Sequence, residues 1–378
     1  MFWVRIALEA CAAAALAAVV YHYVGYPLLL RLAAALGRAP AEPAPLTVLP
    51  TLSVIIPCYN EAGTLPAKLE DLRAADYPVD EVEIVVVSDG SSDETEAVAR
   101  GNEGVRVVSW PERRGKPAAL NAGAEQATGE VLVFTDANAR VPPESLRELV
   151  APFADPRVGA VCGEQVVTRG ASSERAYWRW EARIKELEAA VGSAVGADGS
   201  LYAVKRGLYK RVPEGRLLMD DFFVSLEVVA AGYRLAYAPA AVAYEEALDD
   251  GRGEFKRKAR IMAGSVAALA ALDVAIWRRL PWQLFSHKIL RWLGPAFLAV
   301  AFGASAAATA AGSVFGAVLL AVQSLFYGAA AAGWLWRGRR APLLFRAPYF
   351  FALANAALAY GWSQYFFGGK KPAWEKLR

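Results

Sequence analysis

Polar side chains suited to catalysis or metal binding follow three predicted strands, at the point where each strand ends. The three groups are Tyr59, Asn60 and Glu61; Ser88, Asp89, Gly90 and Ser91; and Asp136, Ala137 and Asn138. Because the carboxyl ends of parallel strands meet at one edge of a sheet, we expect these groups to lie close together. Carboxylates repel phosphates, so acids beside a phosphate-bearing ligand require a divalent cation between them. The pattern therefore predicts a site for a phosphate ester and a divalent cation.

These groups depend on alternating strands and helices. Continuous apolar runs predict buried strands at 53–57, 83–87, 105–109 and 131–135, with helices at 65–73, 93–100 and 118–127 between them. Thr64 and Pro66 mark the start of the first of these helices. Repeated βα units with continuous apolar strands predict an α/β domain, in which helices cover both faces of a parallel sheet.

Composition excludes several other classes of protein. The 378 residues include 41 Lys+Arg and 38 Asp+Glu, and a net charge of +3 does not support a nucleic-acid binder driven by positive charge. With 56% hydrophobic and 21% charged residues, the chain combines a soluble domain with membrane segments. Cys11, Cys58 and Cys162 form no metal or disulfide pattern, and two histidines argue against a zinc site or a Ser-His-Asp triad. No predicted strand is followed by the glycine-rich motif of a dinucleotide-binding protein or of a P-loop protein.

Seven motifs resemble, in order, those of the membrane-bound family-2 glycosyltransferases, which include cellulose, chitin, hyaluronan and nodulation-oligosaccharide synthases. They lie at 53–61 (SVIIPCYNE), 87–92 (VSDGSS), 114–121 (RGKPAALN), 135–138 (TDAN), 197–202 (ADGSLY), 219–221 (MDD) and 257–261 (RKARI). One such motif would be weak evidence for the resemblance, whereas the whole series in this order is specific to the family. The resemblance covers residues 53 to about 264. It implies a Rossmann-like GT-A catalytic domain and a UDP-sugar-dependent hexosyltransferase.

The resemblance also implies a role for each matching residue. Asp221 is expected to be the general base, with Asp220 as the second catalytic residue. The expected donor-binding residues are Pro57, Tyr59, Glu61, Asp89 at the uracil, Lys116, Asp136 and Arg260. The transferred sugar and the acceptor are expected at Asp198, Gly199, Ser200 and Arg257. Asp136 and Asn138 are expected to bind Mg²⁺ or Mn²⁺.

The chain departs from the family pattern at three positions. Asn138 replaces the second acid of the metal motif, and an amide oxygen ligates a hard cation with less charge. Arg257 replaces a glutamine, and Ile261 replaces a tryptophan that would stack on the acceptor sugar. The sequence therefore leaves open how the acceptor is held and whether synthesis is processive.

Structural interpretations of the same residues also remain open. Asp89 could form a turn with Gly90, Asp220 and Asp221 could stabilise the start of a helix at 222–230, and Lys116 could be a solvated surface residue. The basic run at 255–260 could face lipid headgroups.

Three uncharged apolar stretches are long enough to cross a membrane: 10–30, 292–336 and 347–367. We expect the first to be an uncleaved anchor rather than a signal peptide, because it is long and contains several tyrosines and Pro27. The second is long enough for two crossings at ~1.5 Å per residue, with a hairpin near 304–313. The third contains Asn355, Ser363 and Gln364, so either a crossing or a re-entrant segment is compatible with it.

Basic residues flank these stretches and predict their orientation. They are Arg31, Arg38, Arg278, Arg279, Lys288, Arg291, Arg337, Arg339 and Arg340. By the positive-inside rule, residues 40–290 face the cytoplasm and the N-terminus lies outside. Lys370, Lys371 and Lys376 leave the side of the C-terminus open.

The predicted organisation is an N-terminal transmembrane anchor at 1–38, a GT-A domain at 51–250, an interfacial amphipathic helix at 251–280 and a C-terminal transmembrane region at 285–378. The amphipathic helix is inferred from apolar residues at helical spacing between 261 and 276.

The sequence thus predicts a multi-pass enzyme of the cell membrane that makes β-linkages with inversion. Its partners would be a UDP-sugar, the bilayer and a polysaccharide, oligosaccharide or lipid-linked acceptor, with no nucleic acid and with homo-oligomers left open. The main alternative is a distributive enzyme that adds one sugar to a lipid. A non-catalytic membrane protein with a degenerate domain and a transporter are weaker alternatives.

Overall fold

The computed structural model describes residues 2–37, 46–169, 172–246, 251–336 and 341–367. The basic residues at 38 and 337–340 and the lysines at 370, 371 and 376, which entered the predicted orientation, lie outside the described residues.

A mixed sheet of seven strands lies at the centre of the region between residues 52 and 246, in the order β3-β2-β1-β4-β6-β5-β7. The strands are β1 (Leu52–Cys58), β2 (Val82–Asp89), β3 (Val105–Trp110), β4 (Val131–Phe134), β5 (Val158–Arg169), β6 (Tyr202–Lys205) and β7 (Arg234–Glu246). Strands β1 to β4 pair in parallel, and β6 runs antiparallel to both β4 and β5. The predicted α/β class and the four predicted strands are therefore confirmed.

Side chains alternate between two cores, one on each face of the sheet. Ile55 and Val87 belong to the core beneath α5 (Lys116–Gln126) and α8 (Asp220–Ala230). Val54 and Val86 belong to the opposite core, with α3 (Leu65–Arg73) and α6 (Ser145–Val150); α4 (Thr95–Arg100) contacts β3. All seven residues of β1 are buried, which explains why the central strands are continuous apolar runs.

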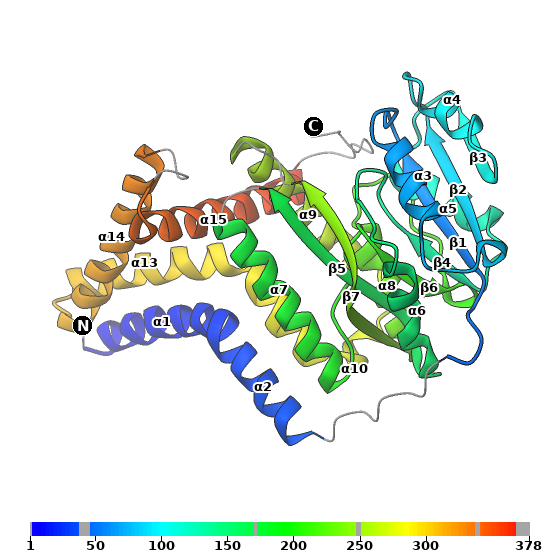
Figure 1. Cartoon of the computed structure of the whole chain (residues 1–378). Coiled ribbons are helices and arrows are strands. Elements are labelled where there is room, and N and C mark those ends of the chain that lie inside the picture. The colour runs from blue at the N-terminus through cyan, green and yellow to red at the C-terminus, as the bar shows by residue number, and fades with distance from the viewer. Residues whose placement is uncertain (1, 38–45, 170–171, 247–250, 337–340, 368–378) are drawn as a thin grey trace.

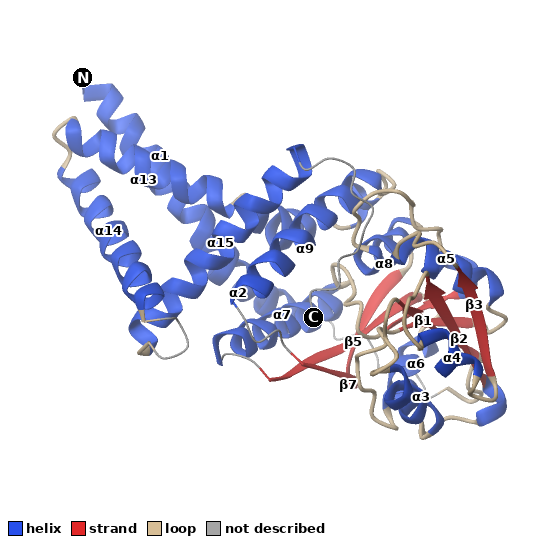
Figure 2. Cartoon of the chain, turned by 90° about the horizontal axis from the view of Figure 1, so that it is seen from above, coloured by secondary structure: helices blue, strands red, loops and turns tan. Residues whose placement is uncertain are grey.

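Strands β5 and β7 extend the sheet toward the helical end of the molecule. They pair in parallel along most of their length, with register shifts between Gly163 and Glu164 and at two other places. Helix α7 (Ser172–Val191) lies beside them (Figure 1). Seen from above, α7 stands between the sheet and the outer helices (Figure 2).

The outer helices match the predicted apolar stretches. The first segment is α1 (Phe2–Val20), a π-helical turn (Tyr21–Gly25) and α2 (Tyr26–Leu36). The second is a hairpin of α13 (Gly294–Ala310) and α14 (Val314–Leu335), and the third is α15 (Leu343–Phe367). By length and composition three described helices could span a membrane: Phe2–Leu36, Val314–Leu335 and Leu343–Phe367. A fourth results if Pro281–Trp292 and Gly294–Ala310, which meet at a 61° bend, form one span.

A buried polar cluster joins the N-terminal helix α2 to α7. Both ring nitrogens of His287 face glutamates of α7: Nδ1 lies 2.9 Å from Glu188 and Nε2 lies 3.1 Å from Glu181. Tyr26 of α2 donates to Glu188 at 2.5 Å, and Lys288 and Arg291 pair with Glu181 at 2.9 and 3.3 Å. We call these six residues the junction cluster. It fixes α7 to α2 and to the segment formed by α11 (Pro281–Gln283), a π-helical turn (Leu284–Ile289) and α12 (Leu290–Trp292).

Helix α9 (Gly251–Ala271) lies where the amphipathic helix was predicted, and α10 (Ile276–Arg279) follows it. Helix α9 packs against α8 and α15, and few of its described side chains are exposed. A Cβ on Gly264 would lie 3.2 Å from the backbone nitrogen of Met219, and that nitrogen donates to the Gly264 carbonyl. Helix α9 thus packs directly against Met219, the residue that precedes Asp220. The location of α9 at a membrane surface stays a prediction.

Candidate active site

The loops after β1 and β2 are bonded to each other at the carboxyl edge of the sheet. Asn60 adopts a positive φ of 54°, a conformation that asparagine tolerates better than most residues. Its backbone nitrogen donates to Ser91 at 3.2 Å, and its side-chain oxygen accepts from the Ser92 nitrogen at 2.8 Å. Glu61 is buried and its nitrogen donates to Thr95 at 2.7 Å. Tyr59 and Glu61 are therefore held in a fixed loop beside the end of β2, next to Pro57 in β1.

Asp89 ends β2 and is almost fully buried. Its carboxylate accepts hydrogen bonds from Trp110 Nε1 at 2.8 Å, from the Arg114 nitrogen at 2.7 Å and from the Gly115 nitrogen at 2.9 Å. Gly115 has a φ of 97°, which favours glycine. Asp89 therefore orders the loop that leads directly into Lys116. Its expected contact with uracil stays a prediction.

An arginine that the sequence reasoning did not single out lies beside this loop. The Arg113 guanidinium stands 3.7 Å from the ring centroid of Tyr59. Within the described part of the chain, its Nε and Nη2 atoms are buried and make no hydrogen bond, and Nε forms a 4.0 Å ion pair with Asp89 Oδ2. A planar cation on an aromatic ring beside the loops of β1 and β2 is suited to a flat, acceptor-rich ligand group.

Four charged residues meet where β4 ends and α8 begins. Lys116 Nζ lies 2.9 Å from Asp136 Oδ1 and 3.5 Å from Asp220 Oδ2. Asp220 and Asp221 are buried, and Asp221 Oδ1 accepts from the Phe222 nitrogen at 2.7 Å. The structure thus brings together Lys116, Asp136, Asp220 and Asp221, although Lys116 and the two acids of α8 are more than 100 residues apart in the sequence.

Gly199 lies against this cluster and, because it has no side chain, leaves space beside the charged groups. A Cβ at this position would lie 3.3 Å from Asp221 Oδ2, 3.4 Å from Lys116 Nζ and 3.8 Å from Asp136 Oδ2. Any side chain here would therefore fill the space between the base candidate and the lysine. The next residue, Ser200, is buried, and its carbonyl accepts from Thr135 Oγ1 at 2.7 Å. This bond ties the loop 197–202 to the end of β4.

Burial makes the acids of the cluster easier to protonate. Desolvation, together with the charge of Asp220, raises the pKa of Asp221 to about 7. Desolvation also raises the pKa of Asp220. Burial alone would lower the pKa of Lys116, but Asp136, Asp220 and Asp221 outweigh it and hold that pKa above its usual range. The cluster therefore contains a permanent cation and a carboxylate that titrates near neutrality, as a general base requires.

We expect kcat/KM to fall below about pH 7, because a base must be deprotonated and burial raises the pKa of Asp221 to about 7. The measurement is kcat/KM between pH 5 and 9, with metal-dependent nucleotide binding followed over the same range as the control. A kcat/KM that stays constant down to pH 5 would contradict the role of Asp221.

The two predicted arginines of α9 have different surroundings. Burial and Arg257 lower the pKa of Arg260, while Asp136, Asp220 and Asp221 act in the opposite direction. The guanidinium of Arg260 therefore lies within electrostatic reach of the acids. Arg257 pairs with Glu254 at 2.9 Å and stands 5.5 Å from the ring centroid of Trp178. Arg260 thus joins the site electrostatically, whereas Arg257 contacts α7.

The carboxylate oxygens of the cluster are suitable ligands for a hard divalent cation that also binds a phosphate. Asp136 is partly exposed, with one oxygen paired to Lys116. Asp220 Oδ2 is buried and accepts no hydrogen bond from the described residues, while Lys116 Nζ lies 3.5 Å from it as an ion-pair partner. Among the described residues, no three His, Cys, Asp or Glu side chains are placed so that they could hold a metal ion on their own. Mg²⁺ commonly binds through one or two carboxylates plus substrate phosphates and waters, so a complete protein cage is not required. Asp136 fits that role, and the ligand role of Asn138 stays a prediction.

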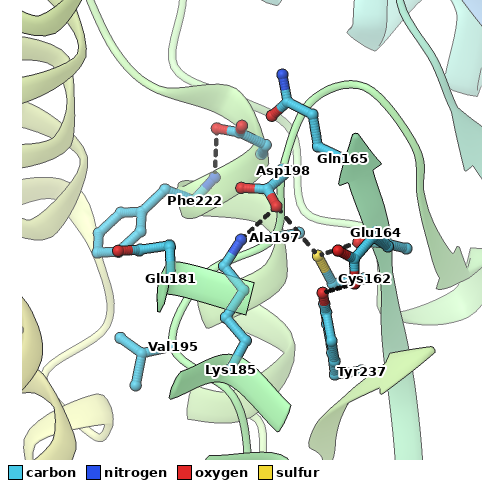
Figure 3. A network of polar contacts seen from close by, with 12 residues as sticks. Cys162, Glu164, Gln165, Glu181, Lys185, Val195, Ala197, Asp198, Phe222 and Tyr237 are labelled. Atoms are coloured by element: carbon cyan, nitrogen blue, oxygen red, sulfur yellow. Dashed lines mark hydrogen bonds and ion pairs between the residues drawn. The ribbon is translucent and has the colours of Figure 1, made fainter. Parts of the chain in front are cut away.

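The site also contains residues that the sequence analysis missed. Lys185 of α7 is buried and forms an ion pair with Asp198 (Figure 3). Lys68 of α3 is buried and donates to Thr135 at 2.9 Å, directly before Asp136. Both lysines lie within helices, where charged residues usually face solvent, so the sequence carried no signal for either.

Comparisons with known proteins show the family of this chain. A family model described as glycosyl transferase family 2 matches residues 53–199. A second model, glycosyl transferase family group 2, matches residues 131–362, which is more than half of the chain.

Two curated relatives match part of the chain. A probable glycosyltransferase, YdaM, from Bacillus subtilis is 27% identical over 57% of this chain and 56% of its own length. The poly-β-1,6-N-acetyl-D-glucosamine synthase of Staphylococcus epidermidis is 26% identical over 56% of this chain and 54% of its own length. The chain therefore spans about half the length of the curated relatives it matches.

One solved structure matches nearly the whole chain. The mannosyltransferase PcManGT from Pyrobaculum calidifontis, in complex with GDP-Man and Mn²⁺, is 30% identical, with a TM-score of 0.73. The match covers 96% of this chain and 99% of that one, including the outer helices.

Proposed function

Because the chain belongs to glycosyltransferase family 2, we propose that it transfers a sugar from a nucleoside diphosphate sugar to a hydroxyl acceptor, with inversion. The observation that carries this proposal is the convergence of Lys116, Asp136 and Asp221 around Gly199, at the carboxyl edge of the sheet.

Each residue of the cluster has a distinct task in this reaction. Asp221 takes the proton from the attacking hydroxyl, for which its raised pKa suits it. Lys116 and Arg260 stabilise the negative charge that develops on the departing diphosphate. Mg²⁺ or Mn²⁺, when held by Asp136 and Asn138, supplies further positive charge to the leaving group. The nucleotide leaves as an anion, so no second carboxylate is needed as an acid.

The donor we expect from the sequence is a UDP-sugar, with its uracil at Asp89 and its loop contacts at Tyr59. The position of Arg113 on the ring of Tyr59 adds it to this base-binding region. A second candidate is GDP-mannose, because the mannosyltransferase that matches 96% of the chain was solved with GDP-Man and Mn²⁺.

We place the catalytic domain on the cytoplasmic face of the cell membrane and the acceptor at the membrane-facing side of the site. Support comes from the basic residues at 278, 279, 288 and 291 beside the outer helices. The acceptor is a polysaccharide, an oligosaccharide or a lipid-linked saccharide of the cell surface. Distributive transfer to a lipid is favoured by the small number of described helices that could span a membrane, three or four, since they leave little room for a polymer channel.

One experiment tests donor, acceptor class and orientation together. Sealed membrane vesicles containing the full chain, in inverted and right-side-out form, receive labelled UDP-sugars or GDP-mannose with Mn²⁺ and octyl β-D-glucoside. Label is then measured in glucoside, lipid and polymer fractions. We expect incorporation only in inverted vesicles and from one donor. Incorporation in right-side-out vesicles would contradict the orientation, and no incorporation from any donor would contradict the function.

A further inference from the structure

A completely buried lysine lies next to the strand end that carries Asp136. Lys68 of α3 has no exposed surface, and its Nζ donates to Thr135 Oγ1 at 2.9 Å. Thr135 is itself buried and directly precedes Asp136. Within the described part of the chain, this is the only hydrogen bond of the Lys68 side chain, and no carboxylate lies within ion-pair distance of it. An ammonium group can donate three hydrogen bonds, so the described residues accept one of the three.

Such a lysine lowers the stability of the fold, because burying a charge without an ion pair is unfavourable. Burial lowers the pKa of Lys68 to about 7, while the charges of Asp71 and Asp136 act in the opposite direction. Residues that cost stability in this way are expected mainly at functional sites. The surroundings of Lys68 therefore favour a role in function rather than in stability.

Thr135 connects Lys68 to the other side of the site. Its hydroxyl hydrogen is donated to the Ser200 carbonyl at 2.7 Å, so its hydroxyl oxygen accepts from Lys68. A hydrogen bond from a cation polarises the hydroxyl and strengthens the bond that the hydroxyl donates. The chain of bonds from Lys68 through Thr135 to Ser200 therefore fixes the backbone before Asp136 against the backbone after Gly199.

Two lysines approach the end of β4 from opposite faces of the sheet. Lys116 begins α5, which packs on one core, and it pairs directly with Asp136 at 2.9 Å. Lys68 belongs to α3, which packs on the opposite core, and it reaches the residue before Asp136. A Cβ on Gly199 would lie 3.4 Å from Lys116 Nζ, so Lys116 borders the space beside Gly199. Lys116 is thus placed to contact a ligand, whereas Lys68 contacts only the protein interior.

We propose that Lys68 is a positioning residue of the metal site, which acts through Thr135 to hold Asp136 in place against the Gly199 loop. The inference rests on the proposed function, because Asp136 is the expected metal ligand. Removal of a group that orients a metal ligand typically changes metal affinity or activity by about 10- to 100-fold. Lys68 would therefore control metal binding without touching the metal or the substrates.

The test separates metal binding from stability in the purified full-length protein. Lys68→Met replaces the ammonium group by an apolar group of similar length, Thr135→Val removes the hydroxyl, and Thr135→Ser retains it. Lys210→Met is the matched control, because it removes a lysine that pairs at 2.7 Å with the buried Glu227 of α8. The nucleotide is UDP or GDP, whichever the parent protein binds. Its affinity is titrated with Mn²⁺ and with EDTA, bound Mn²⁺ is measured by electron paramagnetic resonance, and thermal unfolding is recorded.

We expect Lys68→Met to weaken nucleotide binding with Mn²⁺ by about 10- to 100-fold and to leave nucleotide binding with EDTA unchanged. Its unfolding temperature should equal or exceed that of the parent protein, because an apolar side chain replaces a buried charge that has no ion pair. Lys210→Met should show the reverse pattern. Its affinity with Mn²⁺ should stay at the parent value, and its unfolding temperature should fall because Glu227 loses its ion-pair partner.

The Thr135 variants test the connection between Lys68 and Asp136. Thr135→Val should weaken Mn²⁺-dependent binding by a similar factor, and Thr135→Ser should retain most of it. Thr135→Val also leaves the buried ammonium group without its partner, so its unfolding temperature should fall, and the addition of Lys68→Met should restore it. The double variant should bind Mn²⁺ no more weakly than either single variant, because the two residues act in one chain of bonds.

Three outcomes would overturn the inference. Parent-like Mn²⁺ affinity in Lys68→Met would exclude Lys68 from positioning Asp136. An equal loss of binding with Mn²⁺ and with EDTA, together with a lower unfolding temperature, would assign Lys68 a purely structural role. If Lys68→Met does not fold, equal Mn²⁺ affinities of Thr135→Val and Thr135→Ser would still exclude the chain of bonds. A parent protein whose nucleotide binding does not respond to Mn²⁺ would instead contradict the metal dependence of the proposed function.

Discussion

Asp221→Asn is expected to lower kcat by ~10²–10⁴-fold, the usual contribution of a general base. Asparagine has the shape of aspartate, and its side-chain oxygen can still accept the bond from the Phe222 nitrogen. The substitution therefore removes the basic oxygen while retaining the start of α8. Because the base acts on the acceptor, nucleotide affinity should change little. Steady-state kinetics and calorimetric titration with nucleotide and Mn²⁺ measure the two quantities.

Asp220→Asn is the matched control for this prediction. Asp220 is the neighbouring buried acid at the start of the same helix, so the two variants lose similar helix stabilisation, worth about 1 kcal/mol or less. We expect a milder defect from Asp220→Asn. If Asp221→Asn retained more than about a tenth of kcat, its loss of rate would be smaller than the removal of a general base causes. The base role would then pass to Asp220 or Asp198.

Asp136→Ala is expected to abolish the metal dependence of nucleotide binding and to lower kcat by ~10²–10³-fold or more, as for the loss of a group that stabilises developing charge. Asp136 stands at the end of β4 and is the partly exposed acid of the cluster. Without it, Lys116 retains Asp220 as its partner, so the local charge remains compensated. Nucleotide titrations with and without Mn²⁺ measure the effect.

Variants of Asn138 provide the comparison for Asp136. If Asn138 is a ligand, Asn138→Asp should retain activity and tighten metal binding, and Asn138→Leu should weaken it. Equal metal dependence in Asp136→Ala and the parent protein would remove Asp136 from the ligand set. Unchanged metal affinity in both Asn138 variants would place the second ligand elsewhere.

The first half of the catalytic domain was predictable because its signals are local. Each of the first four strands is a short apolar run followed by a polar turn, and the residues that meet in the site, Asp89, Asp136 and Lys116, stand at those turns. The helix predicted at 118–127 is α5, which begins two residues earlier, at Lys116, directly after the positive φ of Gly115. Local spacing and the order of motifs were therefore sufficient to predict the parallel sheet and the edge of that sheet at which these polar residues lie.

The second half was harder to predict because its structure depends on distant partners. Strand β7 mixes buried and exposed residues irregularly and pairs with β5 across register shifts. Glu181, Lys185 and Glu188 have the spacing of a solvated helix face, yet all three are buried. Their partners include Asp198, Tyr26 of α2 and residues of the segment 281–292, which no local pattern connects to α7. Compensation of buried charge by distant residues is visible only in the folded chain.

The junction cluster limits which segments of this protein can be replaced by those of another protein. Exchanging residues 2–36 for another hydrophobic helix would remove Tyr26 and leave Glu188, which is completely buried, with one fewer donor. Loss of a hydrogen bond to a buried charged group commonly costs about 1.5–3 kcal/mol, a sizeable part of the stability of a domain. The N-terminal segment is therefore an integral element of the fold rather than an interchangeable tether. A functional chimera would have to inherit α7 and the segment 281–292 together with it.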